Sequence, residues 1–182
     1  LMVTGAGSPE SKKHHVPFQQ AIQALYGIAY TIKFTLKFSR KGPEYTIPPL
    51  DGLWWMKGKN DFDLKRPADW RWQLMIAQPN HITAQDIKNA VKTITQRAKK
   101  KKEAPSPFLE KVKLITWNEG LCVQIMHIGP YDKEKPNIDK IHAFAKAKGY
   151  KLRDRHHEIY LGDPRRTPPS KLKTIIRQPI KK

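Results

Sequence analysis

The sequence predicts an α+β fold in which a strand–helix–strand–strand unit occurs twice and the sheets are mostly antiparallel. Three observations predict it. Apolar residues recur at helical spacing in three separate segments, short strand-like runs lie between those segments, and a proline-containing linker at 103–107 divides the chain. We therefore expect a first repeat over residues 1–104 and a second repeat over residues 105–182.

The first repeat is predicted to begin with a strand at 1–4, followed at 5–9 by a turn that contains glycine and proline. Apolar residues between 18 and 36 then recur in steps of three and four, which predicts one long helix. Residues 30–38 also alternate as in a strand, but no turn residue divides the segment, so we prefer the helix. Three aromatic residues lie along one flank of this helix at four-residue spacing: Tyr26, Tyr30 and Phe34.

Two strands and a second helix complete the first repeat. A strand, a turn and a second strand are expected at 45–56, 57–61 and 69–78, in that order. Thr83 and Asp86 have the spacing of a capping box, which indicates the start of a helix. The lysine run at 99–102 suits the end of that helix, because cations are favourable near a helix C-terminus.

The second repeat is predicted to open with a β-hairpin. Its strands are expected at 111–117 and 121–128, and the tight turn between them is Asn-Glu-Gly at 118–120. The remaining elements are expected to be a helix over 136–148 and strands over 156–161 and 173–180.

The charge balance limits the partners that the chain can have. Lysine and arginine number 35 against 16 acidic residues, so the formal net charge is +19. Such a chain associates with polyanions at low salt. No paired zinc ligands, RNA-reading aromatic strand or basic zipper accompanies the charge, so we expect only non-specific association with nucleic acid.

The single cysteine, Cys122, excludes a disulfide within the chain, which fits a cytoplasmic protein. It lies in an apolar run and is predicted to be a buried, inert thiol. No run of eighteen apolar residues occurs, so no membrane span is expected.

Tryptophans and acids are concentrated in one part of the sequence. Four of the five tryptophans lie within nineteen positions: Trp54, Trp55, Trp70 and Trp72. The carboxylate of Asp51 comes just before them. Rings with an acid among them suit a pocket for a flat or cationic organic molecule. The alternative is that the indoles fill the core, as tryptophan often does.

A second acid is placed beside a phenol near the C-terminus. Glu158 and Tyr160 are two residues apart on a predicted strand, so their side chains point to the same side. If that side lines a pocket, burial near rings should raise the pKa of Glu158 and allow it to act as a base or to pair with a cation. The alternative is an exposed strand face on which Glu158 pairs with Arg155 or Arg165.

The histidines predict no metal centre. His156 and His157 are adjacent and face opposite sides of a strand, and no third ligand lies at metal-binding spacing. His127, beside the Gly-Pro-Tyr turn, either lines the pocket or is a hydrogen-bonded structural histidine. No Gly-x-Ser-x-Gly elbow is present, and we expect neither a metal nor a cofactor.

Four segments resemble the GyrI-like small-molecule-binding proteins, in particular the stand-alone bacterial branch that includes cyclopropanoid cyclopropyl hydrolases. They are LDGLWWM (50–56), WRWQLMIAQP (70–79), HIGPYDKE (127–134) and HEIYLGDPRRTPPSKLKTIIRQP (157–179). The resemblance covers nearly the whole chain. It implies tandem strand–helix–strand–strand units that form a central groove, in which the family holds hydrophobic, often cationic or polycyclic, ligands against aromatic rings and a carboxylate.

The resemblance also assigns residues to that groove. Glu158 matches the groove acid of the family, and Asp51 stands where glutamate is more usual. Less specific matches to the aromatic positions are Tyr160, Trp54, Trp55, Trp72 and Tyr131. From the resemblance and the residue types together, the expected ligand-binding residues are Trp54, Trp55, Trp70, Trp72, Tyr26, Tyr30, His127 and Tyr131.

These observations lead us to expect a protein that binds polycyclic small molecules. The sharper hypothesis is that it hydrolyses strained cyclopropanes in genotoxic antibiotics. Glu158 or Asp51 is expected to deprotonate a water, and Tyr160 or Tyr26 to donate a proton to a conjugated carbonyl. The alternatives are a drug-sequestering module without turnover and, third, a polyanion-binding protein.

Overall fold

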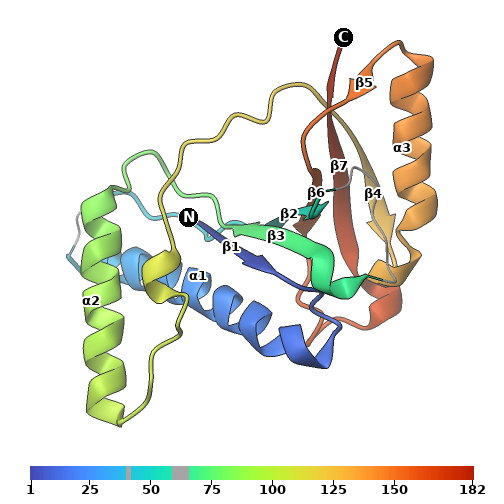
Figure 1. Cartoon of the computed structure of the whole chain (residues 1–182). Coiled ribbons are helices and arrows are strands. Elements are labelled where there is room, and N and C mark those ends of the chain that lie inside the picture. The colour runs from blue at the N-terminus through green and yellow to red at the C-terminus, as the bar shows by residue number, and fades with distance from the viewer. Residues whose placement is uncertain (40–41, 59–65) are drawn as a thin grey trace. The chain divides into compact units, whose positions relative to one another are not determined.

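The computed structural model describes residues 1–39, 42–58 and 66–182, which contain three α-helices and seven β-strands (Figure 1). They form two compact units, which we describe separately. The first unit comprises Leu1–Pro48 with Asp63–Thr116, and the second comprises Pro49–Phe62 with Trp117–Lys182. None of the helices in the described ranges is both long and apolar enough to cross a bilayer.

The first unit contains two paired strands and two helices, and one of the helices covers the strands. β1 (Met2–Ala6) runs antiparallel to β3 (Trp70–Met75), with which it pairs in continuous register. The long predicted helix is present as α1 (Lys12–Ser39), and it packs against both β1 and α2 (Ala84–Lys101). The predicted capping box of α2 is also present, because Thr83 and Asp86 each accept a hydrogen bond from the other's backbone N–H.

Trp72 is the centre of the first unit's core. Its side chain is fully buried, and its Nε1–H donates to the carbonyl oxygen of Gly7 over 3.1 Å. The ring of Phe18 meets the indole edge-on at a centroid distance of 5.2 Å. Gly5 lies directly beneath the indole, where a Cβ atom would come within 2.1 Å of the ring. The indole therefore needs a glycine at position 5.

The second unit is a sheet covered by one helix. Its strands are β2 (Leu50–Met56), β4 (Cys122–Ile128), β5 (Lys151–Leu152), β6 (His156–Tyr160) and β7 (Lys173–Lys181). β6 pairs with both β2 and β7, while β4 and β5 pair with β7, and all these pairings are antiparallel. The helix α3 (Lys135–Ala147) packs on β4 and β7 (Figure 1).

The core of the second unit shows which sheet face the helix covers. Ile141 and Ala145 of α3 pack against Ile176 of β7 in one buried apolar cluster. Ile176 is the cross-strand partner of Glu158, and cross-strand partners point to the same side of a sheet. Glu158 therefore lies on the face that α3 covers, whereas its neighbour His157 lies on the opposite face.

The predicted hairpin at 111–128 is wrong. Residues 111–117 form no strand beyond one isolated bridge between Lys113 and Met2, and β4 pairs with β7 instead. The strand predicted at 45–56 begins only at Leu50, after two prolines that cannot donate ladder hydrogen bonds. The turn predicted at 57–61 falls partly outside the described residues. Cys122 is only half-buried, so the prediction of a buried thiol is also corrected.

The order of elements agrees with the predicted duplication. A strand, a helix and two strands occur as β1, α1, β2, β3 and again as β4, α3, β6, β7, with α2 and β5 added. The compact units do not follow this order, because β2 belongs to the first set but pairs with β6 of the second. The division into repeats at residues 104 and 105 stays a prediction.

Candidate functional site

The candidate site lies on the helix-covered face of the second unit, where β2 and β6 run side by side. Gly52 of β2 is the cross-strand partner of Glu158 of β6. Strand alternation brings Trp54 and Tyr160 to the same face as these two residues. Three of the predicted site residues, Trp54, Glu158 and Tyr160, are therefore brought together.

A chain of hydrogen bonds orients the carboxylate of Glu158. The indole Nε1–H of Trp54 donates to the hydroxyl oxygen of Tyr160 over 2.8 Å. Tyr160 in turn donates its hydroxyl proton to Oε2 of Glu158 over 2.6 Å. The Nε2 atom of His156 lies 3.0 Å from Oε1 of Glu158. The side chain of Glu158 is only 15% exposed, so both carboxylate oxygens interact with protein groups and are largely shielded from bulk water.

Gly52 is required for this arrangement. A Cβ atom at this position would lie 2.8 Å from Nε1 of Trp54 and 3.0 Å from the hydroxyl oxygen of Tyr160. Any side chain here would therefore push apart the two groups that hydrogen-bond to each other. The glycine in the sequence LDGLWWM is explained by this close approach rather than by a turn.

The prediction that burial raises the pKa of Glu158 is wrong. Burial by itself acts in that direction, but hydrogen bonds from His156, Tyr160 and Glu134 outweigh it and lower the pKa below its ordinary value. Glu158 is thus a carboxylate that stays ionised at neutral pH.

The carboxyl group with a raised pKa is that of Glu134, a residue that the sequence did not identify as part of the site. Burial, and then the negative charge of Glu158, raise the pKa of Glu134 to about 9, while Thr174 acts in the opposite direction. Glu134 is the last residue of the segment HIGPYDKE, and it lies 24 positions before Glu158 in the sequence. No local pattern links residues so far apart. They come together because β6 pairs with β7, on which α3 packs.

Two phenols near Glu158 keep their protons. Burial and the charge of Glu158 raise the pKa of Tyr160 well above its ordinary value. Burial, followed by the charge of Glu134, raises the pKa of Tyr131 to about 12. The ring of Tyr131 meets that of Tyr160 edge-on at a centroid distance of 5.7 Å, so the predicted site residue Tyr131 joins the cluster. Both hydroxyls can act as hydrogen-bond donors at neutral pH.

Asp51 lies on the opposite face of the sheet from Glu158. Its Oδ2 atom is 3.8 Å from Nε2 of His157, whose Nδ1 is 2.8 Å from Oε1 of Glu119. Glu119 also accepts a hydrogen bond from Arg177 over 3.0 Å. Asp51 and Glu158, the two acids predicted as alternative bases, therefore belong to separate clusters.

The remaining predicted residues of the second unit lie apart from the carboxylate of Glu158. Trp55 follows Trp54 on the strand, so it points to the other face, and the guanidinium of Arg155 stacks 3.6 Å from its ring centroid. His127 is buried and uses both ring nitrogens within the protein. Its Nε2 lies 3.1 Å from the carbonyl oxygen of Pro130, and its Nδ1 lies 3.1 Å from the amide of Asn137. The structure supports the alternative of a structural histidine.

The other predicted rings belong to the first unit. Trp72 fills the core there, as the alternative interpretation of the indoles had it. Trp70 is half-buried at the start of β3. The predicted aromatic flank of α1 is present, because the rings of Tyr26, Tyr30, Phe34 and Phe38 stack in sequence at about 6 Å spacing. Tyr30 and the two phenylalanines are exposed.

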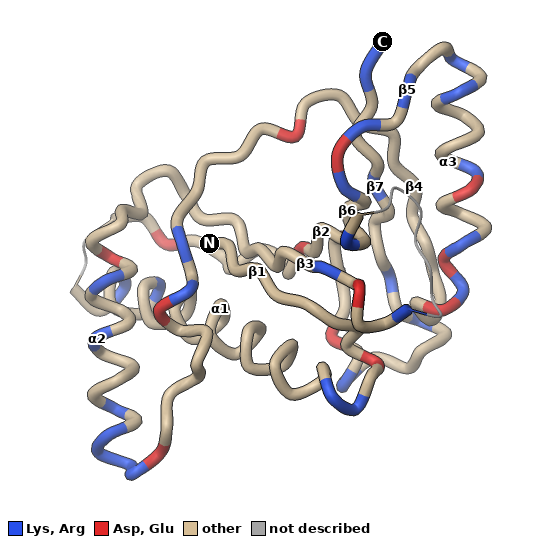
Figure 2. Tube along the Cα trace, viewed as in Figure 1, with Lys and Arg blue, Asp and Glu red and all other residues tan. Residues whose placement is uncertain are grey.

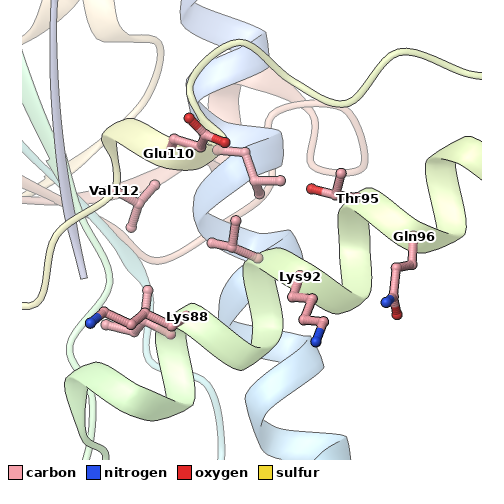
Figure 3. A pocket seen from close by; sticks show the side chains of 9 residues that line it. Lys88, Lys92, Thr95, Gln96, Glu110 and Val112 are labelled. Atoms are coloured by element: carbon pink, nitrogen blue, oxygen red, sulfur yellow. The ribbon is translucent and has the colours of Figure 1, made fainter.

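The first unit also contains a shallow hollow of about 480 Å³ between α2 and the 3₁₀ turn Leu109–Lys111. Figure 3 shows Lys88 and Lys92 of α2 on one side of it, with Glu110 and Val112 on the other. No aromatic ring lines it, so it does not suit a flat polycyclic ligand. In the described parts of the chain, no group of three histidine, cysteine or acidic side chains could hold a metal ion.

The geometry around Glu158 supports two kinds of chemistry. An ionised, largely buried carboxylate beside aromatic rings can attract a cationic ligand. The same carboxylate can accept a proton from a water molecule, and a neighbouring phenol can donate to an oxygen on which negative charge develops.

Comparison with known proteins agrees with the sequence resemblance. The family profile described as the GyrI-like small molecule binding domain matches residues 1–181. Three crystal structures of Listeria innocua proteins are similar to the whole chain, which covers 86% of each of theirs. They are an uncharacterized conserved protein (36% identity, TM-score 0.86) and two proteins described as hydrolases (34% and 38% identity, TM-scores 0.79 and 0.81). A comparison with curated proteins finds no match.

Proposed function

Because the chain belongs to the GyrI-like small-molecule-binding domain family, we propose that it binds hydrophobic or cationic polycyclic molecules at Glu158 and hydrolyses a strained cyclopropane ring in them. The observation that carries this proposal is the orientation of one carboxylate. Glu158 is 15% exposed, receives a hydrogen bond from Tyr160 and contacts His156. Hydrolysis is supported by the two similar Listeria innocua proteins that are described as hydrolases.

In the proposed reaction, Glu158 accepts a proton from water as the water oxygen attacks a carbon of the cyclopropane. A carbon–oxygen bond forms and a carbon–carbon bond of the ring breaks. The electron pair of the broken bond moves to a conjugated carbonyl oxygen, which then takes up a proton. The net change is the addition of one water molecule, so the reaction balances without an oxidant or a reductant. Release of ring strain supplies the driving force.

The proposal gives Tyr160 two tasks. Its hydroxyl proton orients Glu158 in the free protein, and its raised pKa keeps that proton available at neutral pH. When a ligand carbonyl approaches, the same hydroxyl can turn to donate to the carbonyl oxygen as negative charge grows there. Trp54 holds the hydroxyl oxygen in place in both states. Tyr26, the other donor expected from the sequence, lies on α1 of the first unit.

The test uses a cyclopropane-fused, dienone-containing polycycle and follows its conversion by mass spectrometry. The wild type should produce a ring-opened product heavier by one water. Glu158→Gln should lower the rate by about 10²- to 10⁴-fold, the usual contribution of a general base. Glu103→Gln, which changes an exposed glutamate at the end of α2, is the matched control and should leave the rate unchanged. Equal conversion by wild type and Glu158→Gln contradicts the assignment of the base.

Asp51→Asn separates the two candidate bases. Because Asp51 lies on the other sheet face, we expect this variant to retain more activity than Glu158→Gln. A greater loss in Asp51→Asn than in Glu158→Gln transfers the role of base to Asp51. Both variants should be checked for folding by circular dichroism before their rates are compared.

Binding without turnover is the second candidate function, and the lowered pKa of Glu158 favours it. A carboxylate with a low pKa is a weak base but a good partner for a cation. Quenching of tryptophan fluorescence by the same probe measures binding directly. Saturable quenching with no ring-opened product identifies a sequestering module. In either case we propose that the biological role is protection of a bacterial cytoplasm against genotoxic compounds.

A further inference from the structure

Glu134 occupies a position that a structural role does not explain. It lies between the 3₁₀ turn Tyr131–Lys133 and the start of α3, at the cap position of that helix. Its side chain makes no capping hydrogen bond to α3. The residue is only 4% exposed, so the side chain does not reach solvent either. Glu134 and Glu158 each change the pKa of the other through side-chain hydrogen bonding, so the two carboxyl groups lie within reach of each other.

Two carboxyl groups can share a hydrogen bond only if one of them carries a proton. Glu158 contacts His156 and accepts a hydrogen bond from Tyr160, and both interactions favour its ionised form. For Glu134 only Thr174 acts in that direction, and burial and the charge of Glu158 outweigh it. Among the described residues, its Oε1 atom is buried without a hydrogen-bond partner, and the same is true of the hydroxyl of its neighbour Thr174. The proton therefore belongs on Glu134.

Burying a carboxyl group in this way lowers the stability of the protein. The unfolded chain releases the proton near pH 4.5, whereas burial and the charge of Glu158 raise the pKa of Glu134 to about 9 in the folded state. Folding therefore becomes less favourable as pH rises from the unfolded to the folded pKa. A glutamine would fill the same space and donate the same hydrogen bond without that loss. Destabilising ionisable groups of this kind are concentrated at functional sites.

We propose that Glu134 is a positioning residue that holds one proton against Glu158, so that the pair presents a single negative charge to the ligand. The inference deepens the proposed function and rests on it for the identity of the ligand. It implies that the site suits a neutral or singly charged polycycle, because a second carboxylate charge is absent at neutral pH. It also makes Glu134, through its hydrogen bond, one of the groups that set how readily Glu158 accepts a proton.

The first test requires no ligand. The chain contains seven glutamates, so labelling with [5-¹³C]glutamate gives a small set of carboxyl signals for a pH titration by NMR. In the wild type, one carboxyl should titrate several pH units above the others, and Glu134→Gln should remove that signal. The control Glu103→Gln should leave the high-pH signal in place. A wild-type spectrum in which all seven carboxyls titrate below pH 6 overturns the proposal.

The second test measures the pH profile of hydrolysis. Glu134→Ala removes the donor to Glu158, so the acidic limb of the profile should move to higher pH. Glu134→Gln keeps a donor, so its acidic limb should stay where the wild type has it. Identical acidic limbs in wild type and Glu134→Ala overturn the proposal, because a purely structural residue changes the amount of active protein but not this limb.

The two tests distinguish the inference from the proposed function. If the high-pH carboxyl signal is present but the protein neither binds nor converts the probe, the role of Glu134 is supported and the proposed function is contradicted. Conversion by a wild type without that signal supports the proposed function and overturns the role of Glu134.

Discussion

Adjacent residues of β6 point to opposite faces of the sheet, and the charged groups around them differ. Glu158 faces Trp54 and Tyr160, whereas His157 is buried on the other side between two acids. There Glu119 lies 2.8 Å from Nδ1 of His157 and also pairs with Arg177, and the ring of Trp117 packs edge-on against the imidazole. This cluster attaches the segment before β4 to the sheet.

His157 is expected to make the stability of the protein depend on pH. Burial alone lowers the pKa of His157, but hydrogen bonds and charges of Asp51 and Glu119 outweigh it and raise the pKa above its ordinary value. A raised histidine pKa contributes stability that is fully present below the unfolded value near 6.5 and is lost as pH rises through the folded value. Burial alone raises the pKa of Glu119, but its interactions with His157 and Arg177 outweigh burial and lower that pKa. The stability that Glu119 contributes is therefore lost as pH falls below about 4.5.

We therefore predict that His157→Gln destabilises the protein most at mildly acidic pH. At pH 6 the loss should be about 3–5 kcal/mol, because a buried charge pair loses one partner. At pH 9 the loss should be smaller, since the wild-type imidazole then carries less positive charge than at pH 6. Urea unfolding at both pH values measures the difference, with His15→Gln, an exposed histidine, as the control. A loss that is equal at pH 6 and pH 9 contradicts the ionic role of His157.

At the scale of single residues, the sequence predicted what strand alternation controls. It placed Glu158 beside Tyr160, since residues two apart on a strand share a face. It did not find Glu134, and it gave the pKa of Glu158 the wrong direction. The role of Glu134 and the pKa of Glu158 both depend on which side chains from distant segments contact the carboxylate of Glu158. Spacing along the sequence does not contain that information.

At the scale of elements, two glycines let strands lie close to indole rings. Gly5 of β1 lies beneath Trp72, and Gly52 of β2 lies beside Trp54. Glycine weakens a strand, so its presence in both strands is explained by the rings that approach the backbone. Only the second of these contacts involves the proposed ligand site.

Gly52→Ala is predicted to disrupt the site through β2 without removing any polar group. The new Cβ atom would lie 2.8 Å from Nε1 of Trp54 and 3.0 Å from the hydroxyl of Tyr160, so one of the two must move. We expect a loss of stability of about 1–3 kcal/mol from overpacking and a weaker response of tryptophan fluorescence to the ligand. Chemical denaturation and fluorescence titration measure the two effects.

Gly27→Ala in α1 is the matched control for this substitution. Its Cβ atom would meet only Ile94, at an ordinary contact distance of 3.7 Å. In a helix interior, alanine is favoured over glycine by about 0.5–1 kcal/mol, so this variant should be as stable as the wild type or more stable. Full ligand binding by Gly52→Ala contradicts the requirement for a close approach of Trp54 and Tyr160.

The helices were predicted well and the strand pairing less well, for a physical reason. Helical periodicity and the capping box at Thr83 are local, so α1, α2 and α3 could be found from the sequence alone. Strand partners are not local. β4 pairs with β7, about 50 residues later, and the Asn-Glu-Gly turn at 118–120 therefore gave a false hairpin.

At the scale of the whole molecule, a negative site lies in a strongly positive chain. The formal net charge is +19, and lysines and arginines are distributed over the helices and strands of both units (Figure 2). The long-range field of such a chain repels a cationic ligand and attracts polyanions, whereas the carboxylate of Glu158 attracts a cation at short range. Salt screens the long-range part more than the short-range part, because the Debye length is about 10 Å at 0.1 M.

This difference predicts opposite responses to salt for the proposed ligand and for a polyanion. Association with a DNA duplex, followed by fluorescence anisotropy, should weaken by more than about tenfold between 50 and 200 mM salt, since it depends on counterion release. Binding of a singly charged cationic polycycle should change little or become tighter, because screening removes repulsion from the rest of the chain while the buried carboxylate keeps its attraction. A neutral polycycle of the same shape is the control and should show no dependence. If the duplex binds with this salt dependence and the polycycle shows no saturable binding at either salt concentration, the protein is a polyanion-binding protein.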